Sequence, residues 1–148
     1  MFFILLVIII IFGEWRLKSY FEAVYDFKKQ KLICKDSIRL RKYHNSGAFL
    51  NIMEKKKKLL HAVSIIFTTV IALFFLITLS QKGNRVLKFG LSLLLGGAFS
   101  NTYDRLTREY VVDYFSFCSP WKWLNQIVFN ISDFCIIIGT LIVTLNAS

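Results

Sequence analysis

Residues 96–115 read GGAFSNTYDRLTREYVVDYF, and this stretch decides how the rest of the chain can fold. It begins as an apolar helix rich in small residues. It ends with an asparagine, three acidic residues and two arginines. Ionisable groups at the edge of a bilayer are costly and usually mark function. The stretch therefore predicts a transmembrane helix whose polar end contributes to a functional site.

The composition of the chain indicates an integral membrane protein. Hydrophobic residues make up 55% of its 148 residues and charged residues 19%, a balance that a soluble domain of this size would struggle to bury. Long apolar runs alternate with short charged connections, which predicts a single all-α membrane domain over residues 1–148. Its four transmembrane helices are expected at about residues 1–20, 59–79, 87–103 and 127–145.

The first apolar run, residues 1–13, is short for a membrane span and could instead be the core of a signal peptide. No charged residue precedes it and no small-x-small cleavage site follows it. We therefore expect an uncleaved helix that continues through Lys18. Glu14 and Lys18 are four residues apart, so they share one face of this helix and can pair.

The hydrophilic loop between the first two helices contains the signals of a small β-segment. Residues 38–41 alternate apolar and basic side chains, the period of a half-buried strand. The Asn-Ser-Gly sequence at residues 45–47 is a turn signal that could close a hairpin. Residues 110–114, after the third helix, also look extended.

The net charge of +10 is concentrated in one part of the chain, because 13 of the 19 Lys and Arg residues fall within residues 16–58. They lie between two membrane spans and form no recognisable nucleic-acid module, so contact with anionic lipid headgroups is favoured over nucleic-acid binding. Cys34, Cys118 and Cys135 lack zinc-site spacing, and His44 has no metal-ligand partner. Whether Cys34 and Cys118 pair is left open.

Two helices carry polar faces that point to one site. Gly97, Asn101 and Asp104 follow one another at helical spacing, and their face becomes polar toward the end of the third helix. Asn130 and Asp133 are three residues apart in the expected fourth span, where an ionisable residue is a functional-site hypothesis. A separate stripe of small residues on the third helix favours close approach of another helix: Ser92, Gly96 and Ser100.

Four spans in series put the end of the third helix and the start of the fourth on the same side of the membrane. Asp104, Asp113, Asn130 and Asp133 can therefore converge at one depth. Two carboxylates in a low-dielectric site share a proton, which is the chemistry of an aspartic peptidase. The residues alone leave open an ion-translocating or purely structural polar cluster, in which Asp104 pairs with Arg105 at the membrane edge.

The stretch that begins at Gly96 resembles the signature of signal peptidase II, the lipoprotein signal peptidase, whose pattern is roughly G-G-A-x-G-N-x-x-D-R-x-x-x-G-x-V-V-D-F. The sequence FNISD at residues 129–133, followed by Gly139, resembles the second block of the family, F-N-x-A-D with a later glycine. NSGAF at residues 45–49 resembles its N-x-G-A block, and Glu14 with Lys18 resembles D-Q-x-x-K in the first helix. The four blocks occur in family order along nearly the whole chain.

This resemblance implies a membrane aspartic endopeptidase that needs no metal or cofactor. Its substrate would be a diacylglyceryl-modified prolipoprotein, cleaved just before the lipid-bearing cysteine. The protein would act as a monomer in the plasma membrane of a bacterium, in contact with membrane lipids and with its site near the extracytoplasmic face. The implied catalytic dyad is Asp113 and Asp133. The implied supporting and substrate-binding residues are Glu14, Lys18, Asn45, Gly47, Asn101, Asp104, Arg105 and Asn130.

The sequence departs from the family pattern at Glu14, Ser100, Glu109 and Ser132, which replace an aspartate, two glycines and an alanine. The loops after the first and third helices carry 16 Lys and Arg residues, against three after the second, so the positive-inside rule would place the site in the cytoplasm. The family resemblance implies the opposite orientation, which we adopt. The rival hypothesis is a non-catalytic membrane protein of the same fold that binds lipoproteins or translocates ions.

Overall fold

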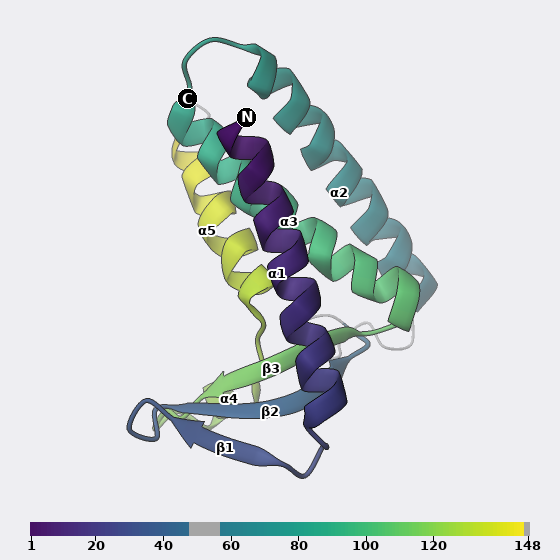
Figure 1. Cartoon of the computed structure of the whole chain (residues 1–148), viewed down its shortest axis with the longest axis vertical. Coiled ribbons are helices and arrows are strands. Elements are labelled where there is room, and N and C mark those ends of the chain that lie inside the picture. Colours follow the sequence, from purple (N-terminus) through teal and green to yellow (C-terminus); the bar gives the residue numbers. More distant parts are fainter. Residues whose placement is uncertain (48–56, 147–148) are drawn as a thin grey trace.

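A computed structural model of the chain describes residues 1–47 and 57–146. Four long helices form a bundle, and a three-stranded sheet lies at one end of it (Figure 1). The N-terminus and the last turn of the final helix lie at the opposite end. The elements are α1 (Phe2–Val24), β1 (Gln30–Ile33), β2 (Ile38–Asn45), α2 (Lys57–Ser80), α3 (Arg85–Arg108), β3 (Val111–Phe117), α4 (Lys122–Gln126) and α5 (Ile131–Asn146).

Helix α3 is the centre of the bundle and contacts α1, α2 and α5. Glycines allow these contacts to be close, as the small residues of the sequence predict. A Cβ atom at Gly96 would lie 2.9 Å from the Cβ of Ile10 in α1. A Cβ atom at Gly97 would lie 2.5 Å from the backbone oxygen of Ser132 in α5, and Gly139 of α5 approaches the backbone of α3 in the same way.

The boundaries of two helices differ from those expected. Helix α3 continues to Arg108, so Asp104 and Arg105 are still helical. Helix α5 begins only at Ile131, and the expected helical start at residue 127 is wrong. The chain before α5 runs alongside β3 instead, where Phe129 and Phe115 exchange backbone hydrogen bonds of 2.7 and 3.0 Å. Among the described residues, α2 alone is long and apolar enough to cross a membrane by length and composition.

The sheet has the antiparallel order β1-β2-β3 and joins two distant parts of the chain. The hairpin between β1 and β2 closes at residues 34–37, where Cys34, Lys35 and Asp36 adopt left-handed backbone angles. The Asn-Ser-Gly turn at residues 45–47 follows β2 and does not close that hairpin. The third strand comes from the connection after α3, so the sheet is not confined to the loop between the first two helices. Ala48 and Phe49 lie outside the described residues.

Two apolar clusters hold the parts together. One lies inside the bundle and includes Val7, Phe75 and Leu94. The other joins the end of α1 to β3, where the ring of Phe21 stacks on that of Tyr114 with centroids 4.7 Å apart. The outer faces of the helices carry exposed apolar side chains, among them Ile9, Phe74 and Leu141.

The cysteines and His44 have structural surroundings of their own. Cys34, Cys118 and Cys135 are free thiols. His44 lies 2.9 Å from the carboxylate of Glu22 and stacks on Tyr110. No group of three or more His, Cys, Asp or Glu residues suited to a metal ion occurs within residues 1–47 and 57–146.

Candidate active site

The edge of the sheet brings the two acids of the predicted dyad together. Asp113 is the third residue of β3 and is 1% exposed. The segment that pairs with β3 through Phe129 passes directly into α5, whose first turn carries Asp133. A backbone bridge between Phe115 and Phe129 therefore places the start of α5 beside Asp113.

Asn130 contacts both acids. Its amide Nδ2 donates to Asp113 Oδ1 at 2.6 Å, and its backbone N–H donates to Asp133 Oδ2 at 3.0 Å. In return, its Oδ1 accepts from the backbone N–H of Asp133 at 3.0 Å. This reciprocal pair is a capping box at the start of α5, which explains the spacing of three residues in local structural terms. The same asparagine thus begins the helix and joins the two carboxyl groups.

Two more amides complete the immediate surroundings of the acids. Asn101 of α3 donates through Nδ2 to Asp133 Oδ1 at 2.9 Å. Asn45, the last residue of β2, donates through Nδ2 to Asp113 Oδ2 at 3.0 Å. Each oxygen of both carboxyl groups therefore accepts a hydrogen bond from an asparagine.

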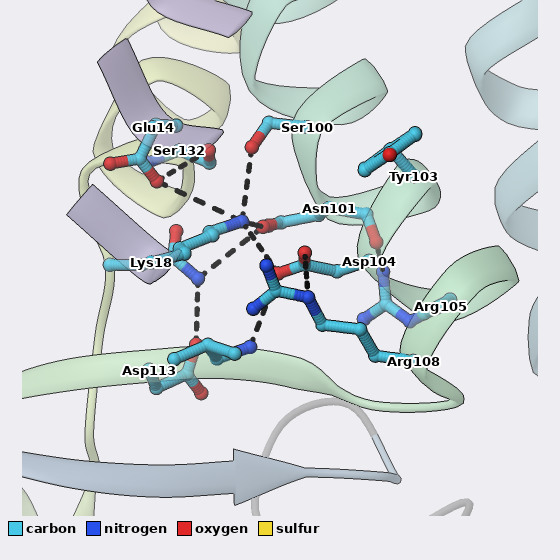
Figure 2. Close-up of polar contacts among 12 residues, drawn as sticks. Glu14, Lys18, Ser100, Asn101, Tyr103, Asp104, Arg105, Arg108, Asp113 and Ser132 are labelled. Atoms are coloured by element: carbon cyan, nitrogen blue, oxygen red, sulfur yellow. Dashed lines mark hydrogen bonds and ion pairs between the residues drawn. The ribbon is translucent and has the colours of Figure 1, made fainter. Parts of the chain in front are cut away.

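Lys18 occupies the centre of a buried ionic cluster behind the acids. Its ammonium group donates to Ser100 Oγ at 3.0 Å and to Asn101 Oδ1 at 2.9 Å, and it lies 3.1 Å from Asp104 Oδ2. Figure 2 shows Lys18 between Glu14 of its own helix and the polar residues of α3. The side chain is 1% exposed, so the pair with Glu14 is part of the interior and not an ordinary interfacial ion pair.

Asp104 anchors the strand that carries Asp113. Its carboxylate accepts a hydrogen bond from the backbone N–H of Val112 at 3.2 Å, one residue before Asp113. It pairs with Lys18 and, at 3.6 Å, with Arg108. The alternative of an edge ion pair between Asp104 and Arg105 is therefore wrong.

Glu14 is also buried, at 2% exposed, and its carboxylate accepts hydrogen bonds from other buried residues. Its Oε2 accepts from the backbone N–H of Ser132 at 3.1 Å and from the Ser132 hydroxyl at 2.8 Å. Its Oε1 accepts from the hydroxyl of Tyr114 at 2.5 Å. Tyr114 directly follows Asp113 and is not among the site residues predicted from the sequence.

A cavity of about 280 Å³ opens beside Asp133. Its polar lining includes Asn45, Arg105 and Asp133, and its apolar lining comes mainly from the chain around residue 128 and from α5. Arg105 donates to the backbone oxygen of Asn101 at 3.4 Å, while its buried Nε has no hydrogen-bond partner among the described residues. Gly47 is buried in the bend after β2.

The surroundings of Asp113 favour its protonated form. Burial raises the pKa of Asp113 to about 8, and the negative charge of Asp133 acts in the same direction. The hydrogen bonds from Asn45 and Asn130 and the charge of Lys18 oppose this rise. A protonated acid beside a second carboxyl group is the arrangement needed for paired acid and base chemistry.

Known proteins similar to this chain share one family description. A family model described as Signal peptidase (SPase) II matches residues 4–148. The chain is 36% identical over 107 residues to a lipoprotein signal peptidase of Shouchella clausii, covering 72% of this chain and 66% of that protein. It is 28% identical over 141 residues to a lipoprotein signal peptidase of Latilactobacillus sakei, covering 95% of this chain and 89% of that protein.

Solved structures share the fold at lower sequence identity. One bacterial membrane enzyme superposes with a TM-score of 0.82 at 21% identity, covering 98% of this chain and 86% of the other. A second structure described in the same words gives a TM-score of 0.81 at 21% identity. At this identity the likeness extends to the arrangement of helices and strands.

Proposed function

The chain belongs to the signal peptidase II family, and on that premise we propose that Asp113 and Asp133 are its catalytic dyad. The protein is an aspartic-type endopeptidase that removes the signal peptides of lipoproteins. The observation that carries the assignment of the dyad is the position of Asn130, which hydrogen-bonds to both acids at once.

The proposed mechanism divides the chemistry between the two acids. The ionised carboxyl group takes a proton from a water molecule, which attacks the scissile carbonyl carbon. The protonated carboxyl group donates its proton to the carbonyl oxygen. When the peptide bond breaks, the carboxyl group that took the proton from water donates it to the leaving amine, and the other carboxyl group regains its proton as the carbonyl re-forms. Asn130, Asn101 and Asn45 hold the carboxyl groups in orientation, and Lys18 with Asp104 supports them from behind.

The proposed substrate is a diacylglyceryl-modified prolipoprotein, cleaved before the lipid-bearing cysteine. The cavity beside Asp133 supports this choice because most of its lining is apolar while Arg105 and the acid provide polar contacts. A substrate held in the bilayer by acyl chains would reach such a cavity by lateral diffusion. Asn45 and Gly47, at the end of β2, would then lie along the approach of the peptide.

We propose that the single domain over residues 1–148 crosses the membrane four times, at about residues 1–20, 59–79 and 87–103 and along α5 from residue 131. Apolar side chains exposed on α1, α2 and α5, such as Ile9, Phe74 and Leu141, support contact with lipid. Ionisable residues within α1 and α3 are compatible with these helices crossing the membrane, because they are shielded from lipid. Glu14, Lys18 and Asp104 are buried and satisfy one another.

The protein is a bacterial membrane enzyme, and we propose that its site lies near the extracytoplasmic face of the plasma membrane. The sheet lies at the end of the bundle opposite the N-terminus, which supports a site on the far side from a cytoplasmic N-terminus (Figure 1). The basic side chains of β1 and β2 would then meet anionic lipid headgroups. We also propose that the protein acts as a monomer, as the resemblance to the family implies.

Cys34 allows this orientation to be tested without adding a new residue. It is an exposed, free thiol in the turn between β1 and β2. A membrane-impermeant maleimide should label it in intact spheroplasts of an expressing strain, and Cys34→Ser should lower that signal to the level given by the less exposed Cys118. Labelling only after lysis would place the sheet in the cytoplasm.

The dyad is tested by substitution of each acid. Asp113→Asn and Asp133→Asn should each lower the cleavage of a purified lipid-modified precursor by about 10³-fold or more, because one of the two proton-transfer groups is lost. Asp26→Asn, at an exposed position outside the site, is the matched control and should cleave at the normal rate. Cleavage by either dyad variant at the wild-type rate would exclude the proposed roles.

A further inference from the structure

Tyr114 connects the segments that carry the two acids. It is 4% exposed and directly follows Asp113 in β3, so the two side chains project to opposite faces of the strand. Its hydroxyl donates to Glu14 Oε1 at 2.5 Å and accepts a hydrogen bond from the backbone N–H of Ile131 at 3.1 Å. One hydroxyl group therefore links β3 to α1 and to the first residue of α5.

The other oxygen of Glu14 holds the second segment. Oε2 accepts from both the backbone N–H and the hydroxyl of Ser132, which directly precedes Asp133. A single buried carboxylate is thus bonded to the residue after Asp113 and to the residue before Asp133. We call Glu14, Tyr114 and Ser132 the clasp.

We propose that Tyr114 is a positioning residue of this peptidase, which acts through Glu14 and Ser132 to fix the separation of the two acids. The proposal rests on Asp113 and Asp133 being the catalytic dyad. Tyr114 does not touch either acid, so it takes no part in proton transfer. Its role is geometric: it adds a buried polar link between β3 and the start of α5, which also meet through Asn130, the backbone pairing at Phe129 and the ring contacts of Phe134 with β3.

The surroundings of Tyr114 suit a fixed donor. Burial and the neighbouring charge of Glu14 raise its pKa, so the hydroxyl keeps its proton at working pH. The ring stacks on Phe21 at an interplanar angle of 13° and belongs to the same apolar cluster as Tyr25. Loss of the hydroxyl alone would leave this packing in place.

The members of the clasp are departures from the family pattern that contact one another. Glu14 replaces an aspartate, Ser132 an alanine, and Tyr114 stands where the pattern ends in phenylalanine. A longer acid is accompanied by two hydroxyl groups that meet its two oxygens. The three changes form one physical unit, so their effects on the reaction should depend on one another.

The first test removes one hydroxyl at a time. Tyr114→Phe and Ser132→Ala should each lower kcat on a lipid-modified precursor by about 10- to 100-fold while KM stays within about twofold, because the acids are displaced and substrate contacts are kept. Tyr110→Phe is the matched control. Its hydroxyl donates to Glu22 at 3.3 Å, away from the acids, and its kcat should not change. Wild-type kcat in both clasp variants, or a change confined to KM, would overturn the proposal.

The second test asks for rescue. The triple variant Glu14→Asp, Tyr114→Phe, Ser132→Ala restores the family residues together and should return kcat to within about threefold of the wild type, well above the product of the single effects. A triple variant as poor as that product would overturn the clasp as a unit. These outcomes can be told apart from failure of the proposed dyad. If the clasp hypothesis is wrong, Asp113→Asn is still expected to be inactive. If Asp113→Asn is active, the assignment of the dyad is wrong.

Discussion

The two halves of α3 hold their neighbours by different forces. In the first half, taken here as residues 85–97, glycines let other helices approach: Gly90 and Gly97 face α5, and Gly96 faces α1. In the second half, the contacts are polar. Asn101 bonds to Asp133 of α5, and Asp104 pairs with Lys18 of α1. The same two partner helices are thus bound first by packing and then by buried hydrogen bonds and charges.

The difference suggests a division of labour along one helix. Close packing without polar groups sets the distance between helix axes, and lipid offers no competing hydrogen bonds to disturb it. The polar half then orients side chains that are already at the required distance. Substitutions that disturb the packing of the first half should therefore move whole helices and the acids they carry. Substitutions of the polar groups around the second half should leave buried charges unpaired.

The largest expected effect concerns the charge at the centre of the polar half. Lys18→Met removes the cation that pairs with Asp104 and Glu14 and leaves two buried carboxylates without it. We expect the free energy of unfolding in mixed micelles to fall by about 3–5 kcal/mol. Arg108→Met removes a more exposed partner of Asp104 and should cost about 1 kcal/mol or less. Equal losses in the two variants would show that burial of the charge is not the deciding factor.

Much of this arrangement was predictable from the sequence. The apolar runs predicted the helical segments, and the small residues predicted that α3 would be closely packed. Serial topology predicted that Asp113, Asn130 and Asp133 would meet, and the structure brings them together. Their catalytic role stays a prediction. These features depend on local pattern and chain order, which the sequence states directly.

The features that were missed depend on contacts between distant segments. The pairing of β2 with β3 and the backbone bridge at Phe129 leave no periodic signal, because both involve segments far apart in sequence. One missed feature did have a local signal. Asn130 followed three residues later by Asp133 matches a helix-capping pattern, which would have moved the start of α5 from residue 127 to residue 131.

The second prediction concerns the pH dependence of stability, which Asp113, a neighbour of the polar half of α3, should influence. Burial raises the pKa of Asp113 to about 8, whereas the unfolded chain ionises near the ordinary value. Between these pH values the native state binds more protons than the unfolded state, so stability should fall as pH rises. This group should contribute at most about 1.4 kcal/mol per pH unit, or about 3 kcal/mol between pH 5 and pH 7.

Thermal unfolding across this pH range checks the prediction. Asp113→Asn has no proton to lose, so its stability should change less with pH than that of the wild type. Parallel pH profiles for the two proteins would contradict the raised pKa.

The third prediction tests the apolar half of α3. Gly97→Ala adds a Cβ atom only 2.5 Å from the backbone oxygen of Ser132. This oxygen belongs to the backbone of α5, so it cannot move aside unless α5 shifts. We expect a loss of about 2 kcal/mol in the free energy of unfolding, together with lower kcat because Asp133 follows Ser132.

Gly96→Ala is the matched control for that change. Its new Cβ atom would lie 2.9 Å from the Cβ atom of Ile10, so α1 must shift while α5 stays in place, and the higher helix propensity of alanine offsets up to about 1 kcal/mol. Its loss of stability should therefore be smaller than that of Gly97→Ala, and kcat should fall less because the contact between α3 and α5 is kept. If Gly96→Ala lowered kcat as much as Gly97→Ala, the spacing between α3 and α5 would not be the property that matters.

The smallest expected effect is a gain in stability, at the point where the polar half of α3 ends. Glu109 ends the helix with a left-handed backbone, at φ 66° and ψ 2°, and it stands where the family pattern has glycine. A side chain costs about 1 kcal/mol in this conformation, and glycine largely avoids that cost. Glu109→Gly should therefore raise the free energy of unfolding by about 0.5–1 kcal/mol. Glu109→Ala removes the same exposed charge but keeps the strain, so it should give no gain. Equal stabilisation by both variants would assign the effect to the charge of Glu109 and would mean that α3 ends under electrostatic repulsion instead of backbone strain.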